Sequence, residues 1–421
     1  MKRRRLLTNK IEPEYLKFTA LEDGTFKFSG NGISYSLNEG ATWVSLAANT
    51  NTPTVTSGNS IMWKGTLTPA TNVGIGTFSS TGNFVVSGNT MSLLFGDNYD
   101  SQLSLSGKSY AFYRLFMNCI KLTSAEDMLL PATTLANYCY SQMFNGCASL
   151  TTLPELPATT LAASCYQYMF NGCNSLTTVP SDLLPSTTLA ASCYRQMFQG
   201  CQSLTTVPEL PATTLVEYCY YNMFVACSSL TTVPSTLLQA TTLASYCYGG
   251  MFNSCTSLTT IPSTLLPATT LANNCYEYMF ARCTSLTTIP STLLPATTLA
   301  TSCYQGMFQV CTSLTTAPEL PVTTLTDYCY QYMFYGCTSL TTAPSLPATT
   351  LATYCYRQMF YNCTSLTYIK CLATNISATN CTTNWVSGVA ATGTFVKAPN
   401  MTTWTTGNNG IPSGWTVQNA V

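Results

Sequence analysis

The stretch Leu135-Ala-Asn-Tyr-Cys-Tyr-Ser-Gln-Met-Phe-Asn-Gly-Cys-Ala-Ser-Leu-Thr-Thr-Leu-Pro154 is the unit from which most of this chain is built. Close copies follow it to about residue 370, and a degraded copy precedes it. The second cysteine of each copy recurs in steps of 26 or 28 residues, along Cys119, Cys147, Cys173, Cys201, Cys227, Cys255, Cys283, Cys311, Cys337 and Cys363. A fixed period of this length predicts a solenoid of about ten units, each buried against its neighbours.

The spacing of apolar residues predicts a helix and then a short strand in every unit. Apolar side chains recur every four residues in two adjacent rows, Leu135-Cys139-Met143-Cys147 and Ala136-Tyr140-Phe144. This pattern is typical of one broad helical stripe, and Thr133 or Thr134 could cap the helix. Prolines follow the second cysteine, so any strand there is short. We therefore expect an α/β repeat solenoid, with a helix and a short strand in each unit, preceded by a small all-β domain.

The buried side of the solenoid is predicted from the same rows. The expected core side chains in the first two clear units are Met143, Phe144, Cys147, Met169, Phe170 and Cys173. Two cysteines eight residues apart on one helix lie about 12 Å apart, too far for a disulfide and unsuited to a metal site. We interpret the repeat cysteines as small buried apolar residues. Outside the array, Cys371 and Cys381 are the best candidates for a disulfide.

The core of the unit also resembles a known repeat. Met143-Phe-x-x-Cys147-x-Ser-Leu150-Thr-x-Leu153 is similar to the Ala-Phe-x-x-Cys-x-x-Leu-x-x-Ile core of BspA-type leucine-rich repeats. The chain departs from that pattern, because Met replaces Ala, Cys-Tyr stands where Ile-Gly is usual, and the units are longer. The resemblance implies a surface protein of gut anaerobes, or a protein of the tailed phages that infect them.

Composition excludes several classes of function. Charged residues make up 8% of the chain, with 16 basic and 16 acidic side chains, so no overall electrostatic footprint for nucleic acid exists. The chain has no histidine, which removes the commonest general base and metal ligand. Paired carboxylates, phosphate loops and nucleotide motifs are also missing from the sequence. We expect no enzyme activity, no cofactor and no metal.

The sequence predicts four parts in the chain, of which the solenoid is the third. Residues 1–13 are predicted to be a disordered basic terminus, because a signal-like Lys-Arg start lacks the apolar segment that should follow. Residues 14–105 are predicted to form a sandwich-like all-β domain, residues 106–370 the solenoid, and residues 371–421 a C-terminal cap. No stretch reaches the roughly 18 apolar residues of a membrane span.

Two hairpins are expected in the all-β domain. Asp23-Gly24 separates two alternating stretches, which is a turn signal. Ser36-Leu-Asn-Glu-Gly-Ala-Thr-Trp43 resembles the Asp-box hairpin of sialidase propellers, with Asn38 where Asp is usual. That motif is structural in its own family, and a single copy indicates a hairpin without implying glycosidase activity.

Residues that differ between copies indicate where a partner would bind. The positions around Met-Phe change freely and are expected to face outward; their tyrosines are Tyr168, Tyr221, Tyr278, Tyr332, Tyr335 and Tyr361. Exposed tyrosines with Gln, Asn and Arg suit contacts to sugars or protein epitopes. Drift on a tolerant surface explains the same variation equally well.

Our leading hypothesis is a non-enzymatic protein of a phage virion surface or tail, assembled in the bacterial cytoplasm. Its β domain would contact other virion proteins, and its solenoid would bind a host glycan or surface protein. The alternative is a BspA-type adhesin on the bacterial cell surface, and a glycan hydrolase is a distant third. Nucleic-acid binding and membrane insertion are not expected.

Overall fold

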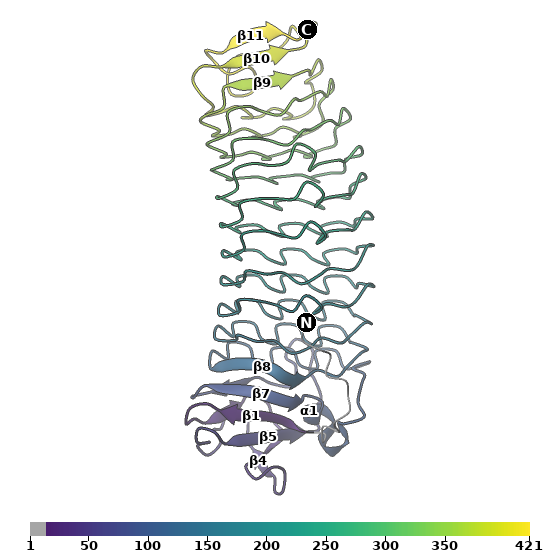
Figure 1. The fold of residues 1–421 in the computed structure, drawn as a ribbon. Helices are drawn as coiled ribbons and strands as arrows, with labels where there is room; N and C mark the ends of the chain where they lie inside the picture. Colours follow the sequence, from purple (N-terminus) through teal and green to yellow (C-terminus); the bar gives the residue numbers. More distant parts are fainter. Residues whose placement is uncertain (1–13) are drawn as a thin grey trace.

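The computed structural model describes residues 14–421, so the predicted basic terminus at 1–13 lies outside the described part. The chain forms one elongated stack of coils, with the N-terminal strands at one end and the C-terminus at the other (Figure 1). A single hydrophobic core runs from Leu16 to Trp415. The repeat solenoid predicted from the sequence is therefore present.

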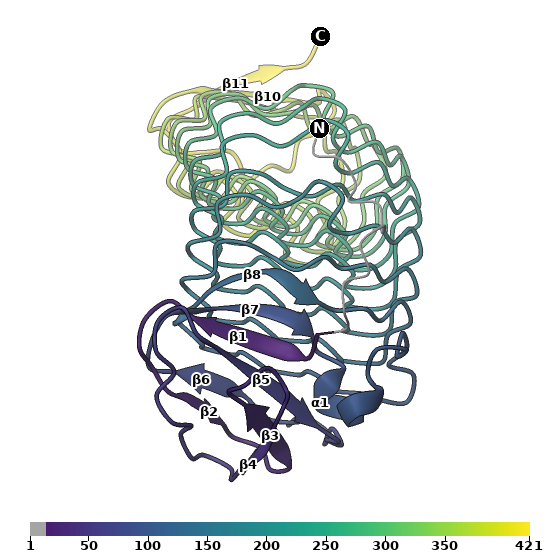
Figure 2. The same cartoon turned by 60° about the horizontal axis from the view of Figure 1, so that its bottom comes forward.

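The N-terminal region is rich in strands and is continuous with the solenoid. Its elements are β1 (Leu16–Ala20), β2 (Phe26–Phe28), β3 (Ile33–Ser36), β4 (Val44–Leu46), β5 (Ser60–Gly65), β6 (Phe78–Ser80), β7 (Phe84–Asn89), α1 (Ser92–Phe95) and the 3₁₀ turn η1 (Gly96–Asn98). Six strands form one sheet in the order β4-β3-β5-β1-β7-β8, and β2 pairs with β6. Because β8 (Leu122–Leu129) belongs to the first solenoid unit, the solenoid grows directly from the edge of this sheet (Figure 2).

One of the two predicted hairpins forms. β3 and β4 pair antiparallel around the Ser36–Trp43 turn, where Asn38 Oδ1 accepts the Thr42 N–H at 2.9 Å as an aspartate would. The hairpin predicted at Asp23-Gly24 is wrong, because β1 pairs with β5 and β7 whereas β2 pairs with β6. Phe18 of β1 and Phe26 of β2 contact each other between the two sheets, with ring centroids 5.4 Å apart.

The helix predicted in each repeat is also wrong. The segment that carries the two cysteines is a run of tight turns, and α1 and η1 are the only helical elements among residues 14–421. Every fourth residue has a positive φ: Tyr138 at 58°, Gln142 at 58° and Gly146 at 75°. A left-handed residue interrupts a right-handed helix. The four-residue spacing therefore arises from successive four-residue turns.

Hydrogen bonds in these turns alternate between the coil itself and the next coil. The Ser141 N–H donates to the Tyr138 carbonyl at 3.1 Å within one turn. The next N–H, that of Gln142, donates to the Gln167 carbonyl of the following coil at 2.8 Å. An α-helix would satisfy both donors internally. Each coil therefore depends on its neighbour for half of the backbone hydrogen bonds in this segment.

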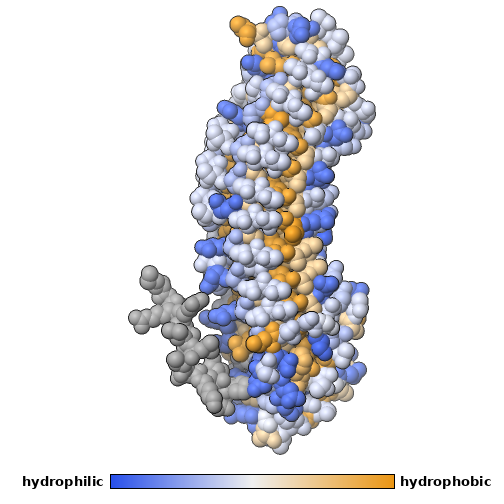
Figure 3. All heavy atoms as spheres, turned by 90° about the vertical axis from the view of Figure 1, so that its right-hand side faces the viewer, coloured by the Kyte–Doolittle hydropathy of each residue, from blue (hydrophilic) through white to orange (hydrophobic). Residues whose placement is uncertain are grey.

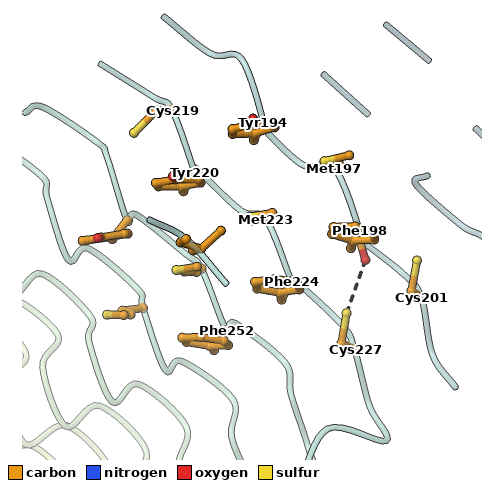
Figure 4. Packing of buried hydrophobic residues seen from close by; sticks show 14 of the residues in the cluster. Tyr194, Met197, Phe198, Cys201, Cys219, Tyr220, Met223, Phe224, Cys227 and Phe252 are labelled. Atoms are coloured by element: carbon orange, nitrogen blue, oxygen red, sulfur yellow. Dashed lines mark hydrogen bonds between the residues drawn. The ribbon is translucent and has the colours of Figure 1, made fainter. Parts of the chain in front are cut away.

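Two ladders of aromatic rings fill the interior. The core residues predicted from the sequence, Met143, Phe144, Cys147, Met169, Phe170 and Cys173, are all fully buried. Tyr140 and its copies to Tyr356 stack with centroids 5.7–6.2 Å apart. Phe116 and its copies to Phe360 stack at 5.5–5.9 Å (Figure 4). Such offset stacking adds to the energy of burial.

The cysteines take part in the packing as free thiols. All 21 are free and buried. In each clear repeat the second cysteine donates its S–H to the phenylalanine carbonyl of the preceding coil, as Cys227 does to Phe198 at 3.3 Å (Figure 4). The disulfide considered for Cys371 and Cys381 is not formed. Cys371 lies on β9 (Tyr368–Cys371), whereas the Cys381 thiol donates to the Ile376 carbonyl.

The C-terminal segment continues the stack and closes it. β9, β10 (Thr394–Lys397) and β11 (Thr416–Asn419) form a parallel sheet in the order β11-β10-β9. Trp385 stacks on Tyr356 at 6.1 Å and on Trp404 at 5.6 Å, so indoles extend the tyrosine ladder beyond the last repeat. Large rings thereby cover the end of the core.

Replacing Val310 with glycine is expected to stabilise the protein. Val310 has φ of 60°, a conformation that is strained for a β-branched residue. Gly336 holds the same position in the next coil at φ of 70°. We expect Val310→Gly to raise the free energy of unfolding by about 1 kcal/mol, and Gly336→Val to lower it. Urea unfolding of both variants provides the measurement, and a loss of stability in Val310→Gly would contradict the argument.

Stability is also expected to decrease at alkaline pH. Burial raises the pKa of Cys201, Cys255 and Cys311 from 9.0 to about 12. Above pH 9 the unfolded chain loses these protons whereas the folded chain keeps them. The free energy of unfolding should therefore be constant below about pH 8 and fall steadily from there toward pH 12. Urea midpoints across this range test the prediction, and midpoints independent of pH would refute it.

Candidate functional site

The variable positions of the repeat gather on one side of the solenoid, which we call the turn face. It consists of the segments between the Leu-Ala step and the second cysteine of each coil. In the first clear repeat its variable positions are Asn137, Tyr138, Ser141, Gln142, Asn145 and Gly146. Ser141 is buried, and the other five are exposed or half-buried. The residues between them, Cys139, Tyr140, Met143 and Phe144, are buried. The tight turns thus place successive pairs of residues alternately on the turn face and in the core.

Sequence differences between coils are concentrated on this face. The position of Ser141 holds, in the following coils, Gln167, Arg195, Tyr221, Gly249, Glu277, Gln305, Gln331 and Arg357. The inward Cys, Tyr, Met, Phe and Cys are the same in all nine clear copies. The Thr-Thr pairs elsewhere in the coil vary little as well. The turn face is therefore where one coil differs chemically from the next.

The six tyrosines predicted to face outward are all half-buried on the turn face. Tyr332, Tyr335 and Tyr361 lie together: Tyr335 stacks on Tyr361 at 4.9 Å, and Tyr332 meets Tyr335 edge to face. Tyr221 and Tyr278 lie two coils apart, and Tyr168 lies on an earlier coil. The structure thus joins three of the six into one group.

A second set of tyrosines escaped the sequence analysis. They occupy the turn-face position just before the first cysteine and stack in pairs of adjacent coils: Tyr110 on Tyr138 at 4.8 Å, Tyr218 on Tyr246 at 4.6 Å, and Tyr328 on Tyr354 at 4.9 Å. All six side chains are half-buried. The sequence did contain a signal for these tyrosines: the residue before the first cysteine alternates between Tyr and Ser among the copies.

Each tyrosine pair has an arginine beside it. The Arg195 guanidinium lies 5.4 Å from the Tyr218 ring centroid and 5.3 Å from that of Tyr221. Arg357 lies 5.3 Å from Tyr354, and Arg114 lies 4.7 Å from Tyr113, which contacts Tyr110 edge to face. Guanidinium groups over aromatic faces are held by cation–π attraction. Within residues 14–421 the ion pairs are Lys17–Glu14 and Lys64–Asp97, so none of these three arginines is paired with a carboxylate there.

The turn face also holds one buried carboxyl group. Glu277 is 9% exposed, and burial raises the pKa of its carboxyl while a hydrogen bond from Asn274 at 2.7 Å opposes the shift. It occupies space left by Gly249, where a Cβ would lie 2.9 Å from the Tyr221 ring and 3.3 Å from Glu277 Cγ.

Apolar surface lies next to these polar groups. The half-buried aliphatic side chains just before the turns recur from coil to coil: Leu161, Ala162, Ala190, Val216, Leu243, Ala272, Ala300, Leu325 and Ala352. Figure 3 shows an apolar band along the long axis, bordered by polar residues. A partner on the turn face could therefore extend its contact onto apolar surface.

Other kinds of site find no support in the described part of the chain. Within residues 14–421 no group of three His, Cys, Asp or Glu side chains is placed to hold a metal ion. None of the helices there is long and apolar enough to cross a membrane. The turn face offers aromatic rings, amides, hydroxyls and guanidinium groups, which suit binding.

Comparison with known families identifies the repeat. The model of the BspA type leucine rich repeat region matches in six copies, over residues 108–231, 184–306 and 250–382. These matches together span more than half of the chain. A comparison with curated proteins finds no match.

Replacing Gly249 with glutamine tests the packing of Glu277. Glutamine occupies the same position in three other coils, as Gln167, Gln305 and Gln331, so the backbone accepts it. Beside Gly249, however, a side chain would collide with Tyr221 and Glu277. We expect Gly249→Gln to lower stability by about 1–3 kcal/mol and to shift the Glu277 pKa back toward its ordinary value.

Carbon-detected NMR of the Glu277 carboxyl group, together with urea unfolding, provides the measurement. Gln167→Gly, at the equivalent position four coils from Glu277, is the control, and it should leave the Glu277 pKa raised. An unchanged pKa in Gly249→Gln would show that the gap at Gly249 does not hold the carboxyl group.

Proposed function

Because the chain belongs to the BspA-type leucine-rich repeat family, we propose that it is a non-enzymatic recognition protein whose turn face binds a glycan or protein on a host cell surface. One observation carries the proposal: apart from the proline-flanked loop, whose length varies by two residues, the coils differ mainly on that face. We attribute this variation to selection for a partner and not to drift on a tolerant surface.

The chemistry of the turn face supports binding. Tyrosine and arginine are the residues most often found at the centre of protein interfaces, and tyrosine rings also pack against sugars. The rings at Tyr335 and Tyr361 are already stacked, and Arg357 already lies between Tyr332 and Tyr354. Because neighbouring side chains hold each other in place, a partner would lose little entropy in ordering them.

The threonine side of the coils is less suited to this role. The Thr205 hydroxyl donates to the Thr177 carbonyl of the preceding coil at 2.9 Å, and Thr315 does the same to Thr287 at 3.0 Å. These hydroxyl protons stabilise the stack and are not free for a ligand. The alternative that the threonines form the contact face is therefore less favoured than the turn face.

We place the protein on a phage virion or tail, with the N-terminal strands attaching it to other virion proteins. The free buried thiols support assembly in a reducing cytoplasm, since proteins that fold in oxidising compartments tend to form disulfides. A bacterial cell-surface adhesin is the alternative location. Mass spectrometry of purified phage particles should find this chain; its absence from particles and presence on uninfected cells would favour the adhesin.

Binding to cells tests the turn face directly. In the variant Tyr332→Gln, Tyr335→Asn and Tyr361→Asn, each new residue already occurs at the same position of another coil, as in Gln196, Asn171 and Asn253. We expect this variant to bind a panel of gut anaerobes at least about tenfold more weakly than the wild type, because aromatic anchors carry most of the energy of an interface.

Flow cytometry with labelled protein provides the measurement. The control is Thr231→Ser with Thr259→Ser on the threonine side, which should bind as the wild type does. Equal binding by the turn-face variant and the wild type would refute the assignment of the turn face.

A further inference from the structure

The paired tyrosines of the turn face recur with a period longer than the repeat itself. We call the pairs Tyr110/Tyr138, Tyr218/Tyr246 and Tyr328/Tyr354 the three stations. Corresponding tyrosines of successive stations are 108 or 110 residues apart, which is four coils. The two coils between stations carry small polar residues at this position: Ser164 and Ser192, then Asn274 and Ser302. At roughly 4.8 Å per coil, the stations lie about 20 Å apart along the axis.

The three stations share their chemistry as well as their spacing. Each has two half-buried tyrosine rings in a near-parallel stack, with interplanar angles of 3°, 12° and 9°. Each has an arginine over a tyrosine ring of the station or of its immediate neighbour. The tyrosine pairs repeat at equal intervals, whereas the arginines reach them from different coils. Arg114 lies on the coil of Tyr110, Arg195 on the coil before Tyr218, and Arg357 on the coil of Tyr354.

The groups at a station favour an acidic ligand. Burial and two neighbouring tyrosines raise the pKa of Tyr110, and burial together with the nearby Glu277 carboxyl raises the pKa of Tyr246. Both hydroxyls are therefore protonated and can donate. The arginines have no carboxylate partner among residues 14–421. Two acidic residues lie in the adjoining position, of which Asp327 accepts the Thr353 N–H at 3.0 Å as a brace between coils, and Glu217 is exposed. Guanidinium and hydroxyl donors together suit a carboxylate or sulfate group.

We infer that the three stations are equivalent subsites for one linear acidic polysaccharide that lies along the solenoid axis. This inference rests on the proposed function and specifies its ligand. A partner that meets three like sites at equal intervals must itself repeat along its length. A linear polymer does so, whereas a folded protein does so only if it is itself built from repeats. Once one subsite is occupied, the next is reached by the same chain at high effective concentration.

The test uses the full chain and size-fractionated hyaluronan, polygalacturonate and heparan sulfate, with dextran as the neutral polymer. Titration calorimetry with fragments shorter than the spacing between stations should give three sites per chain. Longer fragments should bind about a hundredfold more tightly, because contacts within one polymer chain reinforce each other. Affinity should fall with added salt and dextran should not bind.

Variants that remove one station distinguish binding at the three stations from non-specific binding. Tyr218→Ser with Tyr246→Ser removes one station, using the residue that the chain itself carries at Ser164, Ser192 and Ser302. We expect two sites instead of three for short fragments, unchanged affinity per site, and at least a tenfold loss of affinity for long ones. The same result is expected for Tyr328→Ser with Tyr354→Ser. Ser164→Ala with Ser192→Ala is the matched control and should bind like the wild type.

The outcomes distinguish this inference from the proposed function. A single site, affinity independent of polymer length, or equal binding of dextran would overturn the three-station arrangement. The absence of binding to all three acidic polymers would overturn it too, while binding of cells through the turn face would leave the proposed function standing. Cell binding that survives the turn-face variant and both station variants would overturn both the inference and the proposed function.

Discussion

The structure depends on a backbone that shares its hydrogen bonds between coils. A left-handed residue at every fourth position turns alternate N–H groups out of the coil, and each then donates to a carbonyl of the next coil, as Gln142 does to Gln167. A single coil would leave these donors unsatisfied, which is costly in a buried segment. Stacking is therefore obligatory, and both ends must be closed: by the sheet from β4 to β8 at one end, and by Trp385 and Trp404 at the other.

The sequence predicted the solenoid but assigned the wrong conformation to its coils. A 26- or 28-residue period predicts stacked units whatever conformation each unit has, so the period alone was sufficient to predict a solenoid. Residues four apart, such as Tyr140 and Phe144, share one side in a helix and also in a run of four-residue turns. The glycines at Gly249, Gly250 and Gly306, in the middle of the apparent helix, were the contrary signal. Glycine is costly inside a helix and favoured where φ is positive.

That the candidate site binds a partner stays a prediction, and the sequence did not show how its tyrosines are grouped. The six tyrosines named from the variation between copies lie half-buried on the turn face, where the constraint to match the coil above and below is weaker than in the core. Which tyrosines touch depends on the register between coils, and that register pairs residues 26 or 28 apart, such as Tyr218 with Tyr246. The N-terminal strands illustrate the same limit, since β1 pairs with β5 and β7 rather than with the strand next to it in sequence.

One physical cause explains why the buried residues are the same in every coil while the turn-face residues differ. A ladder of like rings packs well only if each coil repeats the ring of its neighbour, so a change at Tyr220 or Phe224 would disturb the coils on both sides. A turn-face side chain such as Gln196 meets only partial contact and can be exchanged. Because the backbone hydrogen bonds do not involve these side chains, the chain can change what it presents at one coil while the stack keeps its register. Recognition can therefore diversify along this face without loss of the fold.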